Sequence, residues 1–222
     1  MLTPDEARAQ LQAAGRYLLR HDLTWGNSGN LSARLRPDHI LITASGTRLG
    51  ELDDDDFVIC PLAASPADAY TRKPSKETPT HAAVYQARPD VGAVLHASPF
   101  YSMLVACTDA ALPAGLFVEA MYYLERVARV AYAHPGSIEL GDLVGQQATQ
   151  ANILILENHG VLVYDTSVPE ALMGLHTLEI ACRMVVEAGR AGLQLRSLPP
   201  ATVSDFLTRA GYRPRRQWPG EV

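Results

Sequence analysis

Two pairs of short apolar segments in this chain are joined by linkers that are too short for a parallel crossover. Residues 31–35 and 40–43 form one pair, and residues 152–156 and 161–163 form the other. A parallel connection needs about a dozen residues or more, so we expect each pair to be an antiparallel hairpin. Further apolar runs at 57–60 and 91–96 are expected to be strands of the same sheet. The sequence therefore predicts a mixed, mostly antiparallel central sheet.

Helical segments alternate with these strands. Thr3 and Pro4 supply a capping side chain and a proline at the first helical position, which predicts a helix that continues to about His21. Apolar residues at helical spacing and proline stops predict further helices over residues 75–88, 99–107, 117–128, 137–150 and 169–192. Helices on both faces of one sheet give a three-layer α/β/α fold of the α/β class.

Composition limits the class of protein further. The chain has 222 residues, of which 47% are hydrophobic and 19% are charged, as in an ordinary globular protein. This length fits one domain over residues 1–222, with residues 198–222 forming a C-terminal helix and tail. The net charge of −5 lacks the basic excess that nucleic-acid binding favours, so we expect no nucleic-acid partner.

The cysteines and the N-terminus bear on where the protein works. Cys60, Cys107 and Cys182 lie far apart and match no zinc or disulfide spacing, which favours a reducing, cytoplasmic environment. The N-terminal segment is charged from residue 5 and lacks the apolar core of a secretory signal. Polar residues interrupt every apolar stretch before about 18 residues, so no membrane contact is expected.

Two histidines stand at the ends of predicted strands. His96 ends the run 92–95, and His159 follows the run 153–156. Loops at strand ends commonly carry functional side chains, and neutral imidazole is a favoured ligand of divalent metals such as zinc. The pair therefore indicates a metal site.

A second group lies where the helix over residues 75–88 is expected to begin. Glu77 and His81 are four residues apart, so on a helix they would project from the same side and could serve one site. Lys73, Ser75 and Lys76 place donors just before the helix, where free backbone N–H groups also favour an anion. A phosphate could bind there.

Two small polar loops complete the candidate features. Residues 26–30 supply glycines and amides, and residues 43–47 supply hydroxyls and a glycine. Neither loop matches the glycine patterns of P-loop or Rossmann nucleotide sites, so nucleotide binding is not supported.

Five segments, taken in order, resemble the class II aldolase/adducin family. They read GNSGNLS at 26–32, ITASG at 42–46, PSKETPTH at 74–81, RPDVGAVLH at 88–96 and ENHGVLV at 157–163. The resemblance implies an α/β/α domain with a mostly antiparallel sheet. It also implies a cyclic homotetramer with active sites between adjacent subunits, and dependence on zinc or a related divalent metal such as manganese.

The resemblance also implies roles for individual residues. His96 and His159 resemble metal ligands, and Glu77 resembles the carboxylate that approaches the metal and acts as acid and base. That role would require the pKa of Glu77 to move toward neutrality by desolvation. Tyr132 resembles a tyrosine that protonates the departing aldehyde from a neighbouring subunit. The residues at the positions that hold the substrate phosphate are Asn27, Gly29, Asn30, Ser45, Gly46, Ser75 and Lys76.

One position departs from the family pattern. The family usually reads His-x-His at the end of this strand, whereas the chain reads His96-Ala97-Ser98, and a serine hydroxyl is a poor zinc ligand. Glu77, His96, His159 and water could bind a more labile metal. Alternatively, another histidine such as His81 or His134 could complete the ligand set, or metal binding and aldol chemistry could be lost. Ser98 itself could be an additional ligand.

The function expected from this resemblance is that of a divalent-metal-dependent lyase. Such an enzyme would cleave a small phosphorylated ketose through a metal-stabilised enediolate, because a bound cation stabilises the negative charge that develops when the carbon–carbon bond breaks. Epimerases, dehydratases and decarboxylases of sugar phosphates share the fold and the anion. Ser98 keeps a further alternative open, an adducin-like scaffold without turnover.

Overall fold

A computed structural model describes residues 2–63, 70–209, 216, 218 and 219. The helices are α1 (Pro4–Arg20), α2 (Thr78–Ala87), α3 (Phe100–Ala106), α4 (Val118–Tyr123), α5 (Ile138–Ala148), α6 (Val168–Arg190) and α7 (Pro200–Thr208). The strands are β1 (Asn30–Arg36), β2 (His39–Thr43), β3 (Phe57–Pro61), β4 (Ala93–Ala97), β5 (Val127–Val130), β6 (Ile153–Leu156) and β7 (Gly160–Asp165).

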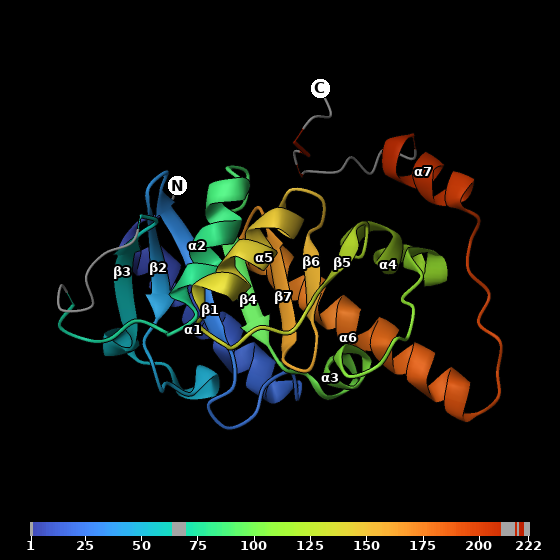
Figure 1. Ribbon diagram of the computed structural model, residues 1–222, viewed down its shortest axis with the longest axis horizontal. Helices are drawn as coiled ribbons and strands as arrows, with labels where there is room; N and C mark the ends of the chain where they lie inside the picture. Colours follow the sequence, from blue (N-terminus) through green and yellow to red (C-terminus); the bar gives the residue numbers. More distant parts are fainter. Residues whose placement is uncertain (1, 64–69, 210–215, 217, 220–222) are drawn as a thin grey trace.

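The seven described strands form one sheet in the order β3-β2-β1-β4-β7-β6-β5 (Figure 1). Every neighbouring pair is antiparallel except β5 and β6, which are parallel. The two predicted hairpins, β1–β2 and β6–β7, are both present. The prediction of a mixed, mostly antiparallel sheet is confirmed.

Side chains alternate between the two faces of the sheet and form two separate cores. On one face, Leu31 and Leu95 pack with α1, α3 and α6. On the other face, Val94 and Leu154 pack with α2 and α5, which contact each other closely. This alternation follows from the two-residue period of a strand. Helices cover both faces, so the expected three-layer α/β/α arrangement is confirmed (Figure 1).

Local sequence signals account for several helix boundaries. At α1, Thr3 and Glu6 form the reciprocal bonds of a capping box. The helix predicted from residue 75 begins only at Thr78, with Glu77 as its N-cap residue. Pro79 accounts for this later start, because proline fits the first turn of a helix but not its interior.

The prediction of one helix over residues 117–128 is wrong at its C-terminal end. Helix α4 ends at Tyr123, and β5 begins at Val127 and pairs in parallel with β6. A short apolar segment can form either a helix or a strand. Here residues 127–130 form a strand because they pair with the edge of β6.

The C-terminal stretch predicted as a helix and tail contains α7, and most of residues 210–222 lie outside the described residues. Arg216 is described and buried, and its guanidinium contacts Asp165 at 2.7 Å and Glu125 at 3.1 Å. Within the described part of the chain, no helix is both long and apolar enough to span a membrane.

Candidate metal centre

The candidate site lies where three chain segments meet at one end of the sheet. His96 is near the end of the central strand β4, and it pairs with Asn30 of β1 on one side and Leu162 of β7 on the other. His159 lies in the β6–β7 turn, directly before β7. Glu77 reaches the same place from the N-cap of α2. Residues distant in sequence therefore converge at the end of the central strand β4.

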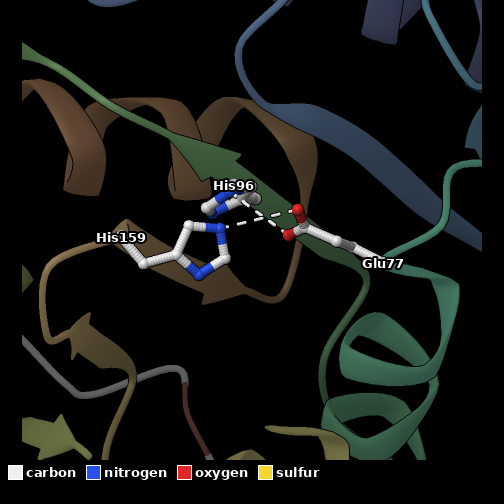
Figure 2. A group of neighbouring side chains, drawn as sticks. All are labelled: Glu77, His96 and His159. Carbon is white, nitrogen blue, oxygen red and sulfur yellow. Dashed lines mark ion pairs between the residues drawn. The ribbon is translucent and has the colours of Figure 1, made fainter. Parts of the chain in front are cut away.

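Glu77, His96 and His159 point toward one another (Figure 2). One carboxylate oxygen of Glu77, Oε2, lies 3.2 Å from His96 Nε2, and the other, Oε1, lies 3.5 Å from His159 Nε2. One candidate ligand atom from each of the three residues lies within 4.8 Å of the others. Ligands bound tetrahedrally at about 2.0–2.2 Å from a zinc ion would be about 3.4 Å apart. The spacing thus fits one shared cation.

The hydrogen bonds of His96 give an independent indication of a cation. Its Nδ1–H donates to the carbonyl oxygen of Val161 at 3.0 Å. In a neutral ring the other nitrogen, Nε2, then carries a lone pair, and this lone pair faces Glu77 Oε2, a buried oxygen without a hydrogen-bond partner. Two buried lone pairs repel unless a positive charge lies between them. A backbone carbonyl on the far nitrogen is also the usual support of a metal-binding histidine.

Burial and mutual charge set the protonation states that a metal needs. Burial opposes ionisation of Glu77, but the positive charges that His96, His159 and His81 carry when protonated, together with a hydrogen bond from His159, outweigh it and lower its pKa to about 2. Burial lowers the pKa of His96, although the Glu77 charge opposes this effect. The carboxylate is therefore ionised and the His96 imidazole neutral at neutral pH, as metal ligands must be. The condition for the acid and base role of Glu77, a pKa moved toward neutrality by desolvation, is not met in these surroundings, because protonated imidazoles stabilise the carboxylate.

A pocket of about 560 Å³ opens onto these three side chains. The residues at the predicted phosphate positions line this same pocket: Asn27, Gly29, Asn30, Ser45, Gly46, Ser75 and Lys76. Ser98 also lines the pocket and is buried. The structure therefore places the candidate anion-binding groups and the candidate metal ligands around one cavity large enough for a small phosphorylated molecule.

Backbone hydrogen bonds hold two of the pocket loops together. Ser45 N–H donates to the carbonyl of Lys73, and Ser75 N–H donates to the carbonyl of Thr43. An isolated antiparallel bridge between Ala44 and Pro74 lies between these bonds. The hydroxyl-bearing turn after β2 is thereby fixed against the segment that leads into α2.

Comparison with known proteins identifies the family of the chain. The family model for the Class II Aldolase and Adducin N-terminal domain matches residues 9–186 of this sequence. The chain belongs to this family.

Individual relatives cover most of the chain. A 3-oxo-tetronate 4-phosphate decarboxylase of Haemophilus influenzae is 28% identical over 88% of this chain and 93% of its own length. An L-fuculose phosphate aldolase of Methanococcus maripaludis is 32% identical over 69% of this chain and 82% of its own. The crystal structure of YgbL from Klebsiella pneumoniae superposes with a TM-score of 0.83 at 27% identity, covering 93% of this chain and all of that one.

The remaining residues singled out from the sequence lie in different surroundings. His81 is buried with Ser32 on Nδ1 and Asn30 on Nε2, and it is not part of the three-residue ligand group. His134 is exposed and lies beside Tyr132, whose hydroxyl is 3.2 Å from His134 Nδ1. Tyr132 is 52% exposed and does not line the pocket of its own chain. Its action from a neighbouring subunit stays a prediction.

Several lining residues were not predicted from the sequence. Trp25, Met103 and Pro135 form apolar parts of the pocket wall, and Trp25 Nε1–H donates to the carbonyl of Ser98 at 3.2 Å. Trp25 directly precedes the glycine-rich loop, which is a weak signal that sequence reasoning could have used. Met103 comes from α3, whose approach to the pocket depends on tertiary packing alone.

Gly29 allows the loop before β1 to pack against β4. Its φ is +86°, and a Cβ built there would lie 2.5 Å from the carbonyl oxygen of His96. We expect Gly29→Ala to lower the free energy of unfolding by about 2–4 kcal/mol, because backbone strain and a clash add. Gly46→Ala is the matched control. Its φ is +81°, but nothing lies within 4 Å of the added Cβ, so a loss of about 1 kcal/mol is expected. Equal losses in urea denaturation would contradict this explanation.

Burial of a neutral His81 should make stability depend on pH. Burial lowers the pKa of His81 from 6.5 to about 3. Between these values the unfolded chain binds a proton that the folded chain does not, so the free energy of unfolding should fall as pH falls through this window. Compared with His81→Gln, the native chain should lose about 1 kcal/mol more per pH unit. Parallel stability profiles of the two proteins, from urea denaturation between pH 4 and pH 7, would count against a buried neutral imidazole.

Proposed function

We propose that the protein is a divalent-metal-dependent lyase that cleaves a carbon–carbon bond in a small phosphorylated ketose. The observation that carries this proposal is the convergence of Glu77, His96 and His159 on a pocket that the predicted phosphate-binding residues also line. Membership of the class II aldolase and adducin family supports the same conclusion.

Glu77, His96 and His159 would hold the cation. A bound divalent ion would polarise the substrate carbonyl and stabilise the negative charge that develops on the adjacent oxygen atoms. Zinc suits two imidazoles and one carboxylate, and manganese accepts the same donors. The lone pairs of His96 Nε2 and Glu77 Oε2, which face each other at 3.2 Å, support this assignment.

Glu77 would also carry the proton in the reaction. Its carboxylate is ionised at neutral pH, so it would enter the cycle as a proton acceptor. The charges that lower its pKa to about 2 belong to protonated imidazoles, and beside neutral imidazoles the burial of the carboxylate acts to raise its pKa. It would then return a proton to the carbon that loses its bonding partner. The residue is only 5% exposed, so its carboxylate is largely shielded from bulk water.

The phosphate would lie against the two bridged loops. Lys76 supplies a positive charge, and Ser45, Ser75, Asn27 and Asn30 supply neutral donors in the same pocket. These groups bind a part of the substrate that does not react, and their binding energy orients the reacting carbon toward Glu77.

Decarboxylation of a phosphorylated 3-oxo acid is the second candidate. The decarboxylase relative aligned over 88% of this chain favours it. Loss of carbon dioxide and aldol cleavage leave the same kind of anion next to a carbonyl. Aldol cleavage alone needs a base that removes the proton of the hydroxyl that becomes the aldehyde carbonyl, whereas both reactions need a proton delivered to the carbon that loses its bonding partner, so they place different demands on the same pocket.

A paired assay would test the proposal. The purified protein would be supplied with zinc or manganese and given a panel of ketose 1-phosphates and 3-oxo-acid phosphates. We expect the release of an aldehyde and dihydroxyacetone phosphate from a ketose phosphate. Release of carbon dioxide without any aldehyde would show that the protein is a decarboxylase and would contradict the proposed aldol cleavage. No turnover of either class, together with no bound metal, would favour a scaffold instead of an enzyme.

Ser98 provides a direct test of how complete the ligand set is. It lies beside the site, since a Cβ on Gly160 would be 3.0 Å from Ser98 Oγ and 3.2 Å from His96 Cε1. We expect Ser98→His to tighten zinc binding about tenfold or more in chelator competition, because imidazole is a better zinc ligand than a neutral hydroxyl. Ser98→Ala should leave affinity unchanged. Unchanged affinity in Ser98→His, or a large loss in Ser98→Ala, would mean that the set is already complete.

A further inference from the structure

A chain of buried hydrogen bonds leads from α2 to the floor of the pocket. Tyr85 Oη lies 2.9 Å from Ser32 Oγ, Ser32 Oγ lies 2.7 Å from His81 Nδ1, and His81 Nε2 lies 2.6 Å from Asn30 Oδ1. Tyr85, Ser32 and His81 are almost completely buried, while Asn30 also lines the pocket. Of these four side chains, only that of Asn30 borders the cavity.

The local structure explains why these groups meet. Asn30 and Ser32 are two residues apart on β1, so they project from the same face of the sheet. His81 and Tyr85 are four residues apart on α2, so they lie one turn apart on the helix. Because α2 covers that face of the sheet, the side chains of Asn30 and Ser32 meet that of His81.

The direction of each hydrogen bond follows from the amide of Asn30. Its Oδ1 can only accept, so His81 Nε2 must carry the hydrogen. The His81 ring is fully buried and both of its hydrogen-bond partners, Ser32 Oγ and Asn30 Oδ1, are uncharged, which favours a neutral ring with no second N–H. His81 Nδ1 therefore accepts from the Ser32 hydroxyl, and Ser32 Oγ accepts from Tyr85.

This direction decides which end of the Asn30 amide is free. A side-chain amide can present either an acceptor oxygen or two N–H donors. Here the oxygen is held by His81, so the amino group is the end left for a ligand. Amino donors favour anionic oxygens, whereas an exposed amide oxygen would repel them.

We propose that His81 is a positioning residue for anion recognition, which fixes Asn30 so that its amino group binds the phosphate of the substrate. This inference rests on the proposed function for the identity of the ligand. Both ring nitrogens of His81 take part in this chain of hydrogen bonds, so the positioning role replaces the metal-ligand role that the sequence left open.

Nuclear magnetic resonance of the native chain tests the directions of these hydrogen bonds without any substitution. Nitrogen shifts should identify His81 as the Nε2–H tautomer, with Nδ1 as the acceptor. Addition of inorganic phosphate should shift the side-chain amino resonances of Asn30. A His81 ring protonated at Nδ1 would overturn the inference, because Asn30 would then turn its oxygen toward the pocket.

Two variants of His81 test the consequence for binding. His81→Leu removes the donor to Asn30, and His81→Gln restores an N–H donor near the position of Nε2. We expect the dissociation constant for inorganic phosphate, measured by calorimetry, to rise about tenfold or more in His81→Leu and less than about threefold in His81→Gln. Tyr85→Phe should bind phosphate as the native chain does, because Ser32 can still donate to His81.

The outcomes separate this inference from the proposed reaction. Native-like phosphate binding and KM in His81→Leu would refute the positioning role, even if carbon–carbon cleavage continued. Phosphate binding that depends on His81, in a protein that turns over neither substrate class, would support the role and contradict the reaction. No phosphate binding by the native chain would overturn the inference, whichever reaction the site performs.

Discussion

The His159→Ala variant is expected to bind zinc or manganese at least about a hundredfold more weakly than the native chain and to keep its fold. His159 supplies one of three candidate ligands, and its loss leaves only His96 and Glu77 near the cation. The residue lies in the β6–β7 turn, outside both hydrophobic cores, so its truncation should leave packing intact. Metal affinity would be measured by competition with a chromophoric chelator, and folding by circular dichroism.

His134→Ala is the matched control for this prediction. It removes an exposed imidazole near Tyr132 that is not part of the ligand group. Its metal affinity should equal that of the native chain. A large loss in His134→Ala, or native affinity in His159→Ala, would assign the ligands differently.

Glu77→Gln should reduce turnover by about a thousandfold or more at saturating metal. Glutamine keeps the shape of the side chain and one carbonyl oxygen, but it can neither accept nor return a proton near neutral pH. The loss should appear in kcat, while KM for the phosphorylated substrate should change by less than about threefold, because the phosphate contacts remain. Steady-state kinetics with excess zinc or manganese would separate the two constants.

Glu157→Gln provides the charge control for this variant. It removes the same charge two residues from His159, from a side chain that does not line the pocket. Native-like turnover is expected. A comparable kcat loss in Glu157→Gln would attribute the effect to the local electrostatic field instead of to proton transfer by Glu77.

Much of the fold could be predicted because local signals agreed with the tertiary structure. The two short linkers required hairpins, and both hairpins formed. Strand β5 could not be predicted in the same way, because no glycine or proline separates residues 127–130 from the preceding helix. These residues form a strand because they pair with β6. Pro79 carried a signal that was missed, and it moved Glu77 from the predicted helix to its N-cap.

The sequence predicted which candidate ligands would lie together, but it did not predict their electrostatics or the partners of His81. The sequence motifs indicated His96, His159 and Glu77, and the structure brings these side chains together. The pKa of Glu77 could not be deduced from burial alone, because its direction depends on imidazoles that come from other segments. The engagement of His81 with Asn30 and Ser32 depends on how α2 lies across β1, which the spacing of Glu77 and His81 does not reveal.

X-ray absorption spectroscopy at the metal edge of the purified native protein tests the central claim most directly. We predict about one divalent ion per chain, with two imidazole ligands and oxygen ligands completing the shell. His96→Ala and His159→Ala should each remove one imidazole from that spectrum. A folded native protein that retains no ion after incubation with zinc or manganese, or whose bound ion has no imidazole ligand, would contradict the claim.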